Sequence, residues 1–234
     1  MDTAAARRSV RDVVKQPSAL LLAVQLVGVL LYPFFEESVL GRGLFEAFGA
    51  LVLALAVWAV PGAPWRTRLA VVLGVIAVTL SVGDAVFEVP FLGATSAAFH
   101  ALFYFWAAAS LMLYMLHDVE VTADELYAVG ATFTLLAWGF AYVFVLLQTV
   151  QPGCFIAAVN PEAQRTWTEL LFLSFTNLSS TGLSDIVPIT AHARSIVMIE
   201  QLCGLGYVAL FVSRLVGLTV TRALLRRDGS DPGS

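Results

Sequence analysis

The stretch of sequence that decides the fold is Asn177-Leu178-Ser179-Ser180-Thr181-Gly182-Leu183-Ser184-Asp185. A short amphipathic segment, Trp167 to Phe175, precedes it, and a long apolar segment, Ile196 to Val220, follows it. The pattern predicts a short helix, then a polar loop, then a helix of membrane length. Irregular backbone at membrane depth is tolerated only where it is buried in protein or lines a water-filled cavity. This loop is therefore the first candidate for a functional site.

The composition is that of an integral membrane protein. Hydrophobic residues make up 59% of the chain and charged residues 13%, and the mean hydropathy is +0.84, far from the values of a soluble domain. A membrane-spanning helix needs roughly 20 apolar residues. The sequence predicts an all-α membrane fold whose six spanning helices lie at about 18–35, 44–60, 67–83, 91–116, 126–149 and 194–220.

The basic residues are distributed unevenly along the chain. If the N-terminus is cytoplasmic, all of the 13 Lys and Arg residues except Arg42, Arg165 and Arg194 fall on or near the cytoplasmic side, where Arg214 is expected to reach the interface. This bias predicts a multi-pass plasma-membrane protein with both termini cytoplasmic. A cleavable signal peptide is the alternative for residues 1–35, but no small-residue cleavage site precedes Tyr32. The two cysteines lie at different predicted depths, so no disulfide is expected.

The loop resembles the potassium-channel signature T-T-V-G-Y-G-D. Gly182 and Asp185 are kept, Ser184 replaces the second glycine and Leu183 replaces the tyrosine. The following turn is similar to the channel pattern G-D-x-x-P-x-T-x-x-A-R and lacks only its leading glycine; the matching residues are Asp185, Pro188, Thr190, Ala193 and Arg194. The resemblance implies a six-helix potassium-channel-like fold, with a re-entrant pore helix and filter loop between the fifth and sixth helices.

The resemblance also implies roles for the loop residues. Such filters replace an ion's water shell with backbone carbonyls and hydroxyls. The ion-binding residues would be Ser180, Thr181, Gly182, Leu183 and Ser184, with Asp185 at the outer mouth. Gly182 meets the need for a positive φ, and a side chain at Ser184 costs on the order of 1 kcal/mol if that position keeps the same conformation. With one glycine, the loop is also similar to those of the Trk/Ktr/HKT potassium and sodium transporters.

Residues around the loop are expected to support it. Thr166 and Glu169 fit a capping box that opens the short helix, and Trp167 fits an interfacial aromatic belt. Glu200, a charged residue within the last span, is expected to be paired or near water, and a bond to a hydroxyl of that helix (Ser174, Thr176 or Ser179) is favoured over a role in permeation. Gly204 and Gly206 fit either a gating hinge or close helix packing, and both alternatives remain open. The supporting residues are Trp167, Glu169, Thr176, Asn177, Ser179 and Glu200.

The chain divides into an N-terminal four-helix block (1–116), a pore module (117–228) and a tail (229–234) that is expected to be disordered. Thr122 or Asp124 is expected to cap the fifth helix. The predicted fourth span, 91–116, has no Arg or Lys. Because a voltage sensor needs several such charges on one helix, voltage sensing by this block is not expected.

The leading hypothesis is a passive channel for monovalent cations, K⁺ and/or Na⁺, that discriminates weakly between them. One loop supplies a quarter of each carbonyl ring, which implies a homotetramer in membrane lipid. The alternatives are the membrane subunit of a cation transporter and a non-conducting, channel-like scaffold. No enzymatic activity, cofactor, nucleic-acid partner or metal other than the permeant ions is expected, since the chain carries no spacing of metal ligands or of a nucleophile with a base.

Overall fold

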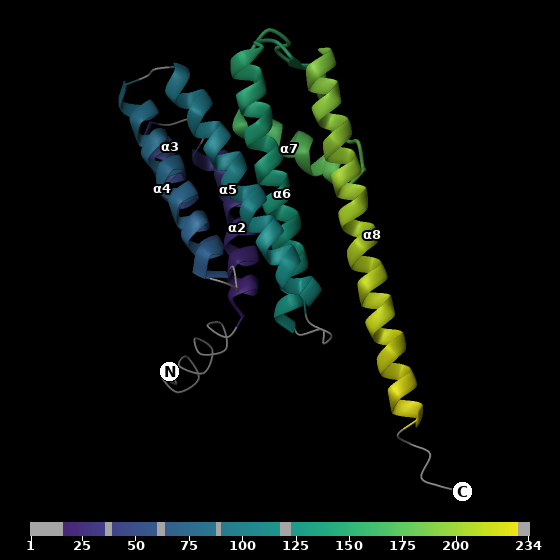
Figure 1. The fold of residues 1–234 in the computed structure, drawn as a ribbon. Coiled ribbons are helices and arrows are strands. Elements are labelled where there is room, and N and C mark those ends of the chain that lie inside the picture. Colours follow the sequence, from purple (N-terminus) through teal and green to yellow (C-terminus); the bar gives the residue numbers. More distant parts are fainter. Residues whose placement is uncertain (1–15, 36–38, 60–63, 88–89, 118–122, 229–234) are drawn as a thin grey trace, which may run out of the picture.

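The structure is a computed structural model that describes residues 16–35, 39–59, 64–87, 90–117 and 123–228. Its long helices are α2 (Pro17–Phe35), α3 (Val39–Ala59), α4 (Pro64–Phe87), α5 (Pro90–His117), α6 (Ala123–Val150) and α8 (Ala191–Asp228). A short helix, α7 (Trp167–Leu178), and the strands β1 (Phe155–Ala157) and β2 (Ile186–Pro188) lie between α6 and α8 in sequence. The start of α2 and the end of α8 lie at the same end of the molecule (Figure 1).

Four of the described helices are long and apolar enough to cross a membrane, over Pro64–Asp84, Phe91–Leu116, Asp124–Val150 and Ala191–Arg214. The apolar segments Pro17–Tyr32 in α2 and Phe48–Ala59 in α3 are shorter. The protein is therefore a helical, multi-pass membrane protein. The basic start of the chain (1–15), Thr122 and the tail 229–234 lie outside the described residues.

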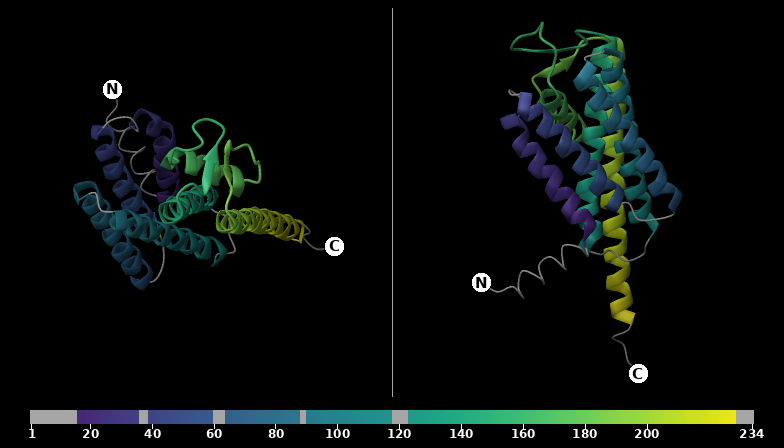
Figure 2. Two further views of the ribbon diagram at one scale, coloured as in Figure 1. Left: turned by 90° about the horizontal axis from the view of Figure 1, so that it is seen from above. Right: turned by 90° about the vertical axis from the view of Figure 1, so that its left-hand side faces the viewer.

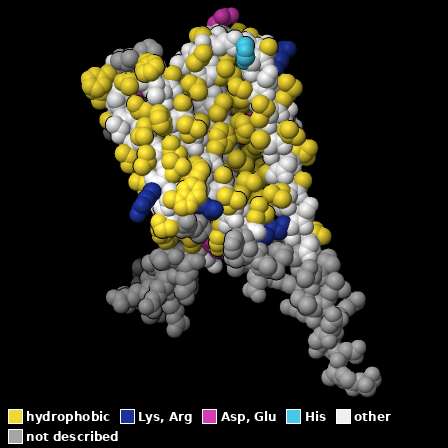
Figure 3. Space-filling view, viewed as in Figure 1, with side chains coloured by type: hydrophobic (Ala, Val, Ile, Leu, Met, Phe, Trp, Pro, Cys, Tyr) yellow, Lys and Arg dark blue, Asp and Glu magenta, His cyan; other side chains and the backbone are white. Residues whose placement is uncertain are grey.

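The helices form a bundle around α5 and α6. Small side chains let the two helices approach closely, and aromatic residues fill the rest of the core, with Phe103 and Tyr104 on α5 and Trp138 on α6 fully or almost fully buried. Figure 2 shows α8 at one side of the bundle, away from α3 and α4. The hydrophobic side chains in Figure 3 cover the middle of the molecule, and most of its visible basic side chains lie toward the lower end.

A two-stranded antiparallel sheet corrects the all-α prediction. Phe155 pairs with Pro188 and Ala157 pairs with Ile186, and the N–H of Ile189 donates to the carbonyl of Cys154. Strands of three residues give too short an alternation to be recognised in sequence. The sheet ties the segment after α6 to the segment before α8.

Two polar contacts at the lower end also differ from expectation. Asp124 lies in the first turn of α6, where its carboxylate accepts hydrogen bonds from the backbone N–H (3.1 Å) and the hydroxyl (2.9 Å) of Ser18. It therefore caps the start of α2 rather than its own helix. Arg214 does not only reach the interface: its guanidinium pairs with Glu125 of α6 at 3.6 Å. Both contacts fasten α6 to other helices.

Candidate functional site

The α7 helix begins with the predicted capping box. The N–H of Glu169 donates to the Thr166 hydroxyl at 3.3 Å, and the Glu169 carboxylate accepts from the N–H of Thr166 at 2.7 Å. Two of the otherwise unsatisfied N–H groups at this helix end are thereby paired. The position at which α7 starts is fixed.

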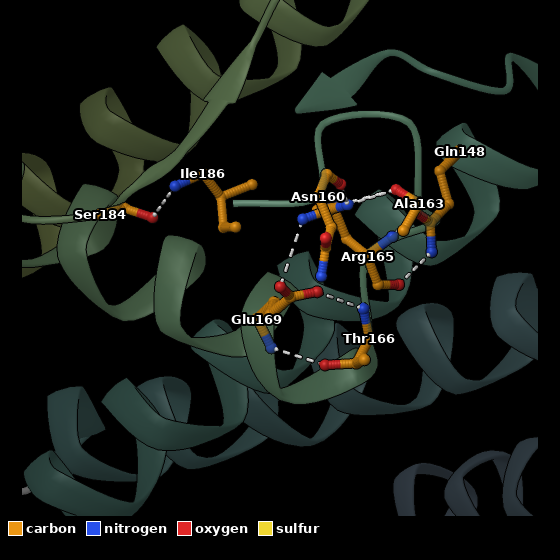
Figure 4. Close-up of polar contacts among 8 residues, drawn as sticks. All are labelled: Gln148, Asn160, Ala163, Arg165, Thr166, Glu169, Ser184 and Ile186. Carbon is orange, nitrogen blue, oxygen red and sulfur yellow. Dashed lines mark hydrogen bonds and ion pairs between the residues drawn. The ribbon is translucent and has the colours of Figure 1, made fainter. Parts of the chain in front are cut away.

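Arg165, which sequence reasoning placed only as an outer basic residue, is 4% exposed and organises the segment before α7 (Figure 4). Its guanidinium donates to the carbonyls of Asn160 (2.6 Å) and Ala163 (3.0 Å, from Nε) and pairs with Glu169 at 3.3 Å. The Gln148 side chain bonds both backbone groups of Arg165, at 2.9 and 3.2 Å. These contacts hold the 160–166 segment against the end of α6.

Trp167 is not simply an interfacial residue. Its ring is only partly exposed. It packs edge-on against Trp138 of α6, with ring centroids 5.3 Å apart, and lies tilted against Tyr32 of α2, with ring centroids 5.1 Å apart. Aromatic pairs in such geometry contribute about 0.5–1.5 kcal/mol beyond their buried area. The start of α7 therefore contacts both α6 and the N-terminal block.

The C-terminal end of α7 is closed by a Schellman motif. Ser179 is the C-cap and Ser180 follows with φ of +59°. The N–H of Ser180 donates to Asn177 O, and that of Thr181 to Thr176 O, each at 2.9 Å. This pair of bonds, with a left-handed residue after the cap, defines the motif. Ser180 thus occupies a position that usually holds glycine, and sequence reasoning did not foresee its backbone conformation.

Beyond the motif, the 179–185 loop is open. Gly182 has the predicted left-handed backbone, with φ of +65°, and its N–H donates to Thr176 O at 3.1 Å. Residues 179–183 are exposed, Leu183 to 78%. The carbonyl oxygens of Thr181, Gly182 and Leu183 accept no hydrogen bond from any residue that the structure describes. Three consecutive carbonyls of the loop therefore have no hydrogen-bond donor within the described part of the chain.

The Ser184 position differs from the expectation drawn from the second glycine. Ser184 is not among the positive-φ residues of the described chain. Its hydroxyl accepts a hydrogen bond from the N–H of Ile186 at 3.0 Å (Figure 4). Because the left-handed conformation is not kept, the strain expected there does not arise. Ser184 instead leads the chain into β2, and Asp185 beside it is exposed.

The turn into α8 gives the quoted outer-turn residues definite partners. Thr190 caps α8, since its hydroxyl accepts from the N–H of Ala193 at 3.4 Å and donates to the Gln151 side chain at 2.9 Å. The guanidinium of Arg194 donates to the carbonyl of Pro188 at 3.1 Å. The turn is thereby fixed to β2 and to the end of α6.

Contacts with α8 hold the C-terminal half of α7. Glu200 is fully buried and meets Ser174 through a hydrogen bond between its Oε1 and the hydroxyl, as predicted. At Gly204, an added Cβ would lie 1.9 Å from the carbonyl oxygen of Leu178, whereas Gly206 has nothing within 4 Å of that position. Gly204 therefore packs closely against the end of α7, and close helix packing is the alternative that this geometry supports for Gly204. The Tyr207 hydroxyl donates to Val129 O of α6 at 2.6 Å.

An open hollow of about 400 Å³ lies where the loop faces α8. It is lined by Ser180, Gly182, Gln201, Leu202 and Leu205. Among the groups of described residues, no cluster of three or more His, Cys, Asp or Glu could hold a metal ion. The two cysteines are free, Cys154 buried and Cys203 exposed.

A bundle of apolar helices that places a short capped helix and an exposed, left-handed loop between two long helices defines a membrane protein of the pore-loop class. A family model described as Ion channel matches residues 102–220, about half of the chain. The chain therefore belongs to this ion channel family of pore-loop cation channels. The match begins within α5 and ends within α8. Comparison with curated proteins and with solved structures gives no match.

Proposed function

We propose that four copies of the chain form a passive channel for monovalent cations whose pore is lined by the 179–185 loop. The observation that carries the proposal is the run of free carbonyls at Thr181, Gly182 and Leu183. A ring of such carbonyls from several chains replaces the water shell of a cation. The C-terminal, negative end of the α7 dipole, at Leu178, lies directly before them and favours a positive ion.

The surface of the single chain supports assembly around this loop. Helix α8 leaves an apolar face exposed between Met198 and Val216, with Leu202 71% and Leu205 62% exposed. The loop beside it is exposed as well. In a fourfold assembly, neighbouring chains cover these surfaces and bring the loops together at the axis. Membrane lipid covers the remainder, and α2 and α3 complete six spans, with α7 entering the membrane and returning.

The departures at Leu183 and Ser184 lead us to propose that the pore passes both K⁺ and Na⁺ with limited discrimination. Leu183 cannot donate the hydrogen bond that a tyrosine in its place would, and Ser184 lacks the left-handed backbone of a second glycine. Selectivity depends on the number and rigidity of the coordinating carbonyls. Fewer fixed carbonyls at the outer end give a less selective filter.

The proposal extends to gating and location. Helix α5 carries no Arg or Lys between Phe91 and Leu116, so the channel opens without voltage sensing. The basic residues predict cytoplasmic termini in a plasma-membrane protein. A bend of α8 at Gly204 and Gly206 remains our candidate for the gate. The family is one of transport proteins, and we propose no enzymatic activity, no bound cofactor and no nucleic-acid partner.

The test is cation flux into liposomes that contain the purified protein, with K⁺ and Na⁺ compared. The variant Gly182→Ala should abolish flux, because Gly182 has φ of +65° and a Cβ is strained there. Gly153→Ala is the matched control: its φ is +76°, it also has open space around it, and it lies outside the loop. It should conduct normally.

The same preparation tests assembly and selectivity. Four chains of 25.2 kDa should purify together. The double variant Leu183→Tyr with Ser184→Gly should raise the preference for K⁺ over Na⁺. A tetrameric Gly182→Ala protein that conducts like the wild type would show that ions do not pass through this loop. Absence of flux in a protein that stays monomeric or dimeric in native lipid would favour the scaffold instead.

A further inference from the structure

The Ser174 hydroxyl lies between two oxygen atoms, and both would need its single proton if Glu200 were ionised. Its Oγ is 2.8 Å from the carbonyl oxygen of Ala137 on α6 and makes a closer contact with Oε1 of Glu200 on α8. A serine hydroxyl has one proton to donate, and a carbonyl oxygen can only accept. Both contacts are satisfied together only when the carboxyl group of Glu200 brings a proton of its own.

The surroundings of Glu200 also favour the neutral acid. The side chain is 0% exposed, and an ionised carboxylate buried without a counter-charge is costly. Helix α7 carries one charged residue, Glu169, which pairs with Arg165. Helix α6 carries none from 126 to 150. On α8, Arg194 bonds Pro188 O and Arg214 pairs with Glu125.

The remaining groups near Glu200 are neutral. Cys203 on α8 is its titratable neighbour, and Tyr207, one turn further, bonds Val129 O. Asn177 is the second polar group beside the carboxyl. Within the described residues, Oε2 of Glu200 and Nδ2 of Asn177 have no hydrogen-bond partner by strict geometry. An amide N–H beside Oε2 is compatible with the carbonyl oxygen of a neutral acid as well as with a carboxylate, so the assignment of the proton rests on the Ser174 geometry and on the missing counter-charge.

We propose that Glu200 is a proton-binding site, and that its neutral acid links α8 through Ser174 to α6 and positions the base of the loop. The acid O–H donates to Ser174 Oγ, and the Ser174 hydroxyl donates to Ala137 O. Loss of the proton to water leaves a buried charge and two acceptors for one hydroxyl proton. Asn177, whose carbonyl accepts the N–H of Ser180, lies in the next turn of α7, so the loop responds to the loss.

The proton itself is tested without any flux measurement. At about pH 7, carboxyl groups at the surface are ionised and do not show the infrared C=O stretch of a protonated acid. A band at this position is therefore expected to come from Glu200. We expect the purified wild-type protein to show this band and Glu200→Gln to lack it. Glu162→Gln, which alters an exposed carboxylate, is the matched control and should keep the band. A wild-type spectrum without it, or a band that survives in Glu200→Gln, overturns the proposal.

The link to the loop rests on the proposed function and is tested by flux as the pH rises from about 7 to about 10. Wild-type flux should be lost as the proton leaves. Glu200→Gln should conduct at every pH, because an amide N–H replaces the acid O–H as donor to Ser174. Equal pH profiles in these two proteins overturn the link. A wild type without flux at any pH, together with the infrared band, refutes the proposed function and leaves the proton site standing.

Discussion

The packing of Gly204 gives a sharp prediction, because two glycines on the same helix have opposite surroundings. In the variant Gly204→Ala, the new Cβ would stand 1.9 Å from the carbonyl oxygen of Leu178 and 2.7 Å from its carbonyl carbon. Both atoms are backbone, so no side chain can rotate away. Helix α8 and the end of α7 must therefore separate. In Gly206→Ala, the Cβ meets nothing within 4 Å.

The expected cost follows from the distance. Ordinary van der Waals contact begins at 3.4 Å, so the backbones must move apart by about 1.5 Å at this point, and overpacking of this kind costs about 1–3 kcal/mol. The bond between Glu200 and Ser174, one turn away, contributes roughly 1 kcal/mol more when it is lost. The higher helix propensity of alanine stabilises the folded variant by about 1 kcal/mol relative to glycine. The net effect is a destabilisation of about 1–3 kcal/mol, against a gain of up to about 1 kcal/mol in Gly206→Ala.

The assay is thermal unfolding of the detergent-purified variants at a fixed scan rate, since membrane proteins often unfold irreversibly. Gly204→Ala should unfold at a lower temperature than the wild type, and Gly206→Ala at the same or a higher one. If Gly204→Ala were as stable as Gly206→Ala, the contact with Leu178 would not be a packing contact. A hinge without packing would then be the better explanation of both glycines.

Three further predictions concern the ends of α7 and the N-terminal block. Ser180→Gly should stabilise the protein by about 1 kcal/mol, because Ser180 holds φ of +59° where glycine is unstrained; a lower unfolding temperature would contradict the Schellman assignment. Thr166→Ala should cost about 1 kcal/mol by removing the hydroxyl of the capping box, and an unchanged unfolding temperature would show that the cap is dispensable. In planar bilayers, the open probability should depend weakly on voltage, since 91–116 carries no Arg or Lys; a steep curve would show that another segment senses voltage.

The helices could be predicted because long apolar runs indicate the spanning segments and the polar residues between them indicate where each helix ends. The bounds of α2, α5 and α6 differ from the predicted ranges by no more than three residues at either end. The start of α7 could also be predicted, because Thr166 and Glu169, three residues apart, form a local capping-box motif. Both signals are contained in a short window of sequence.

The contacts that position the loop could not be predicted because they join distant segments. Nothing near Arg165 in sequence points to Gln148 of α6 as its partner, and a basic residue beside a membrane helix is ordinarily solvated. The pairing of β1 with β2 likewise joins residues about 30 positions apart. Ser180 is a different case. Its left-handed backbone conformation is usually adopted by glycine at the position after a helix C-cap, so a serine there gives no sequence indication of the Schellman motif.

The contacts between α7 and α8 bear on how a gate and a filter would communicate. Gly204 touches the carbonyl of Leu178, the last residue of α7, while Glu200 bonds Ser174 one turn earlier on that helix. The loop begins at Ser179, directly after this contact. If α8 bends at Gly204 and Gly206 as proposed, the bend occurs where α8 presses on the backbone from which the loop starts. Movement at the gate would then displace the free carbonyls of the loop, so the two cannot act independently in this chain.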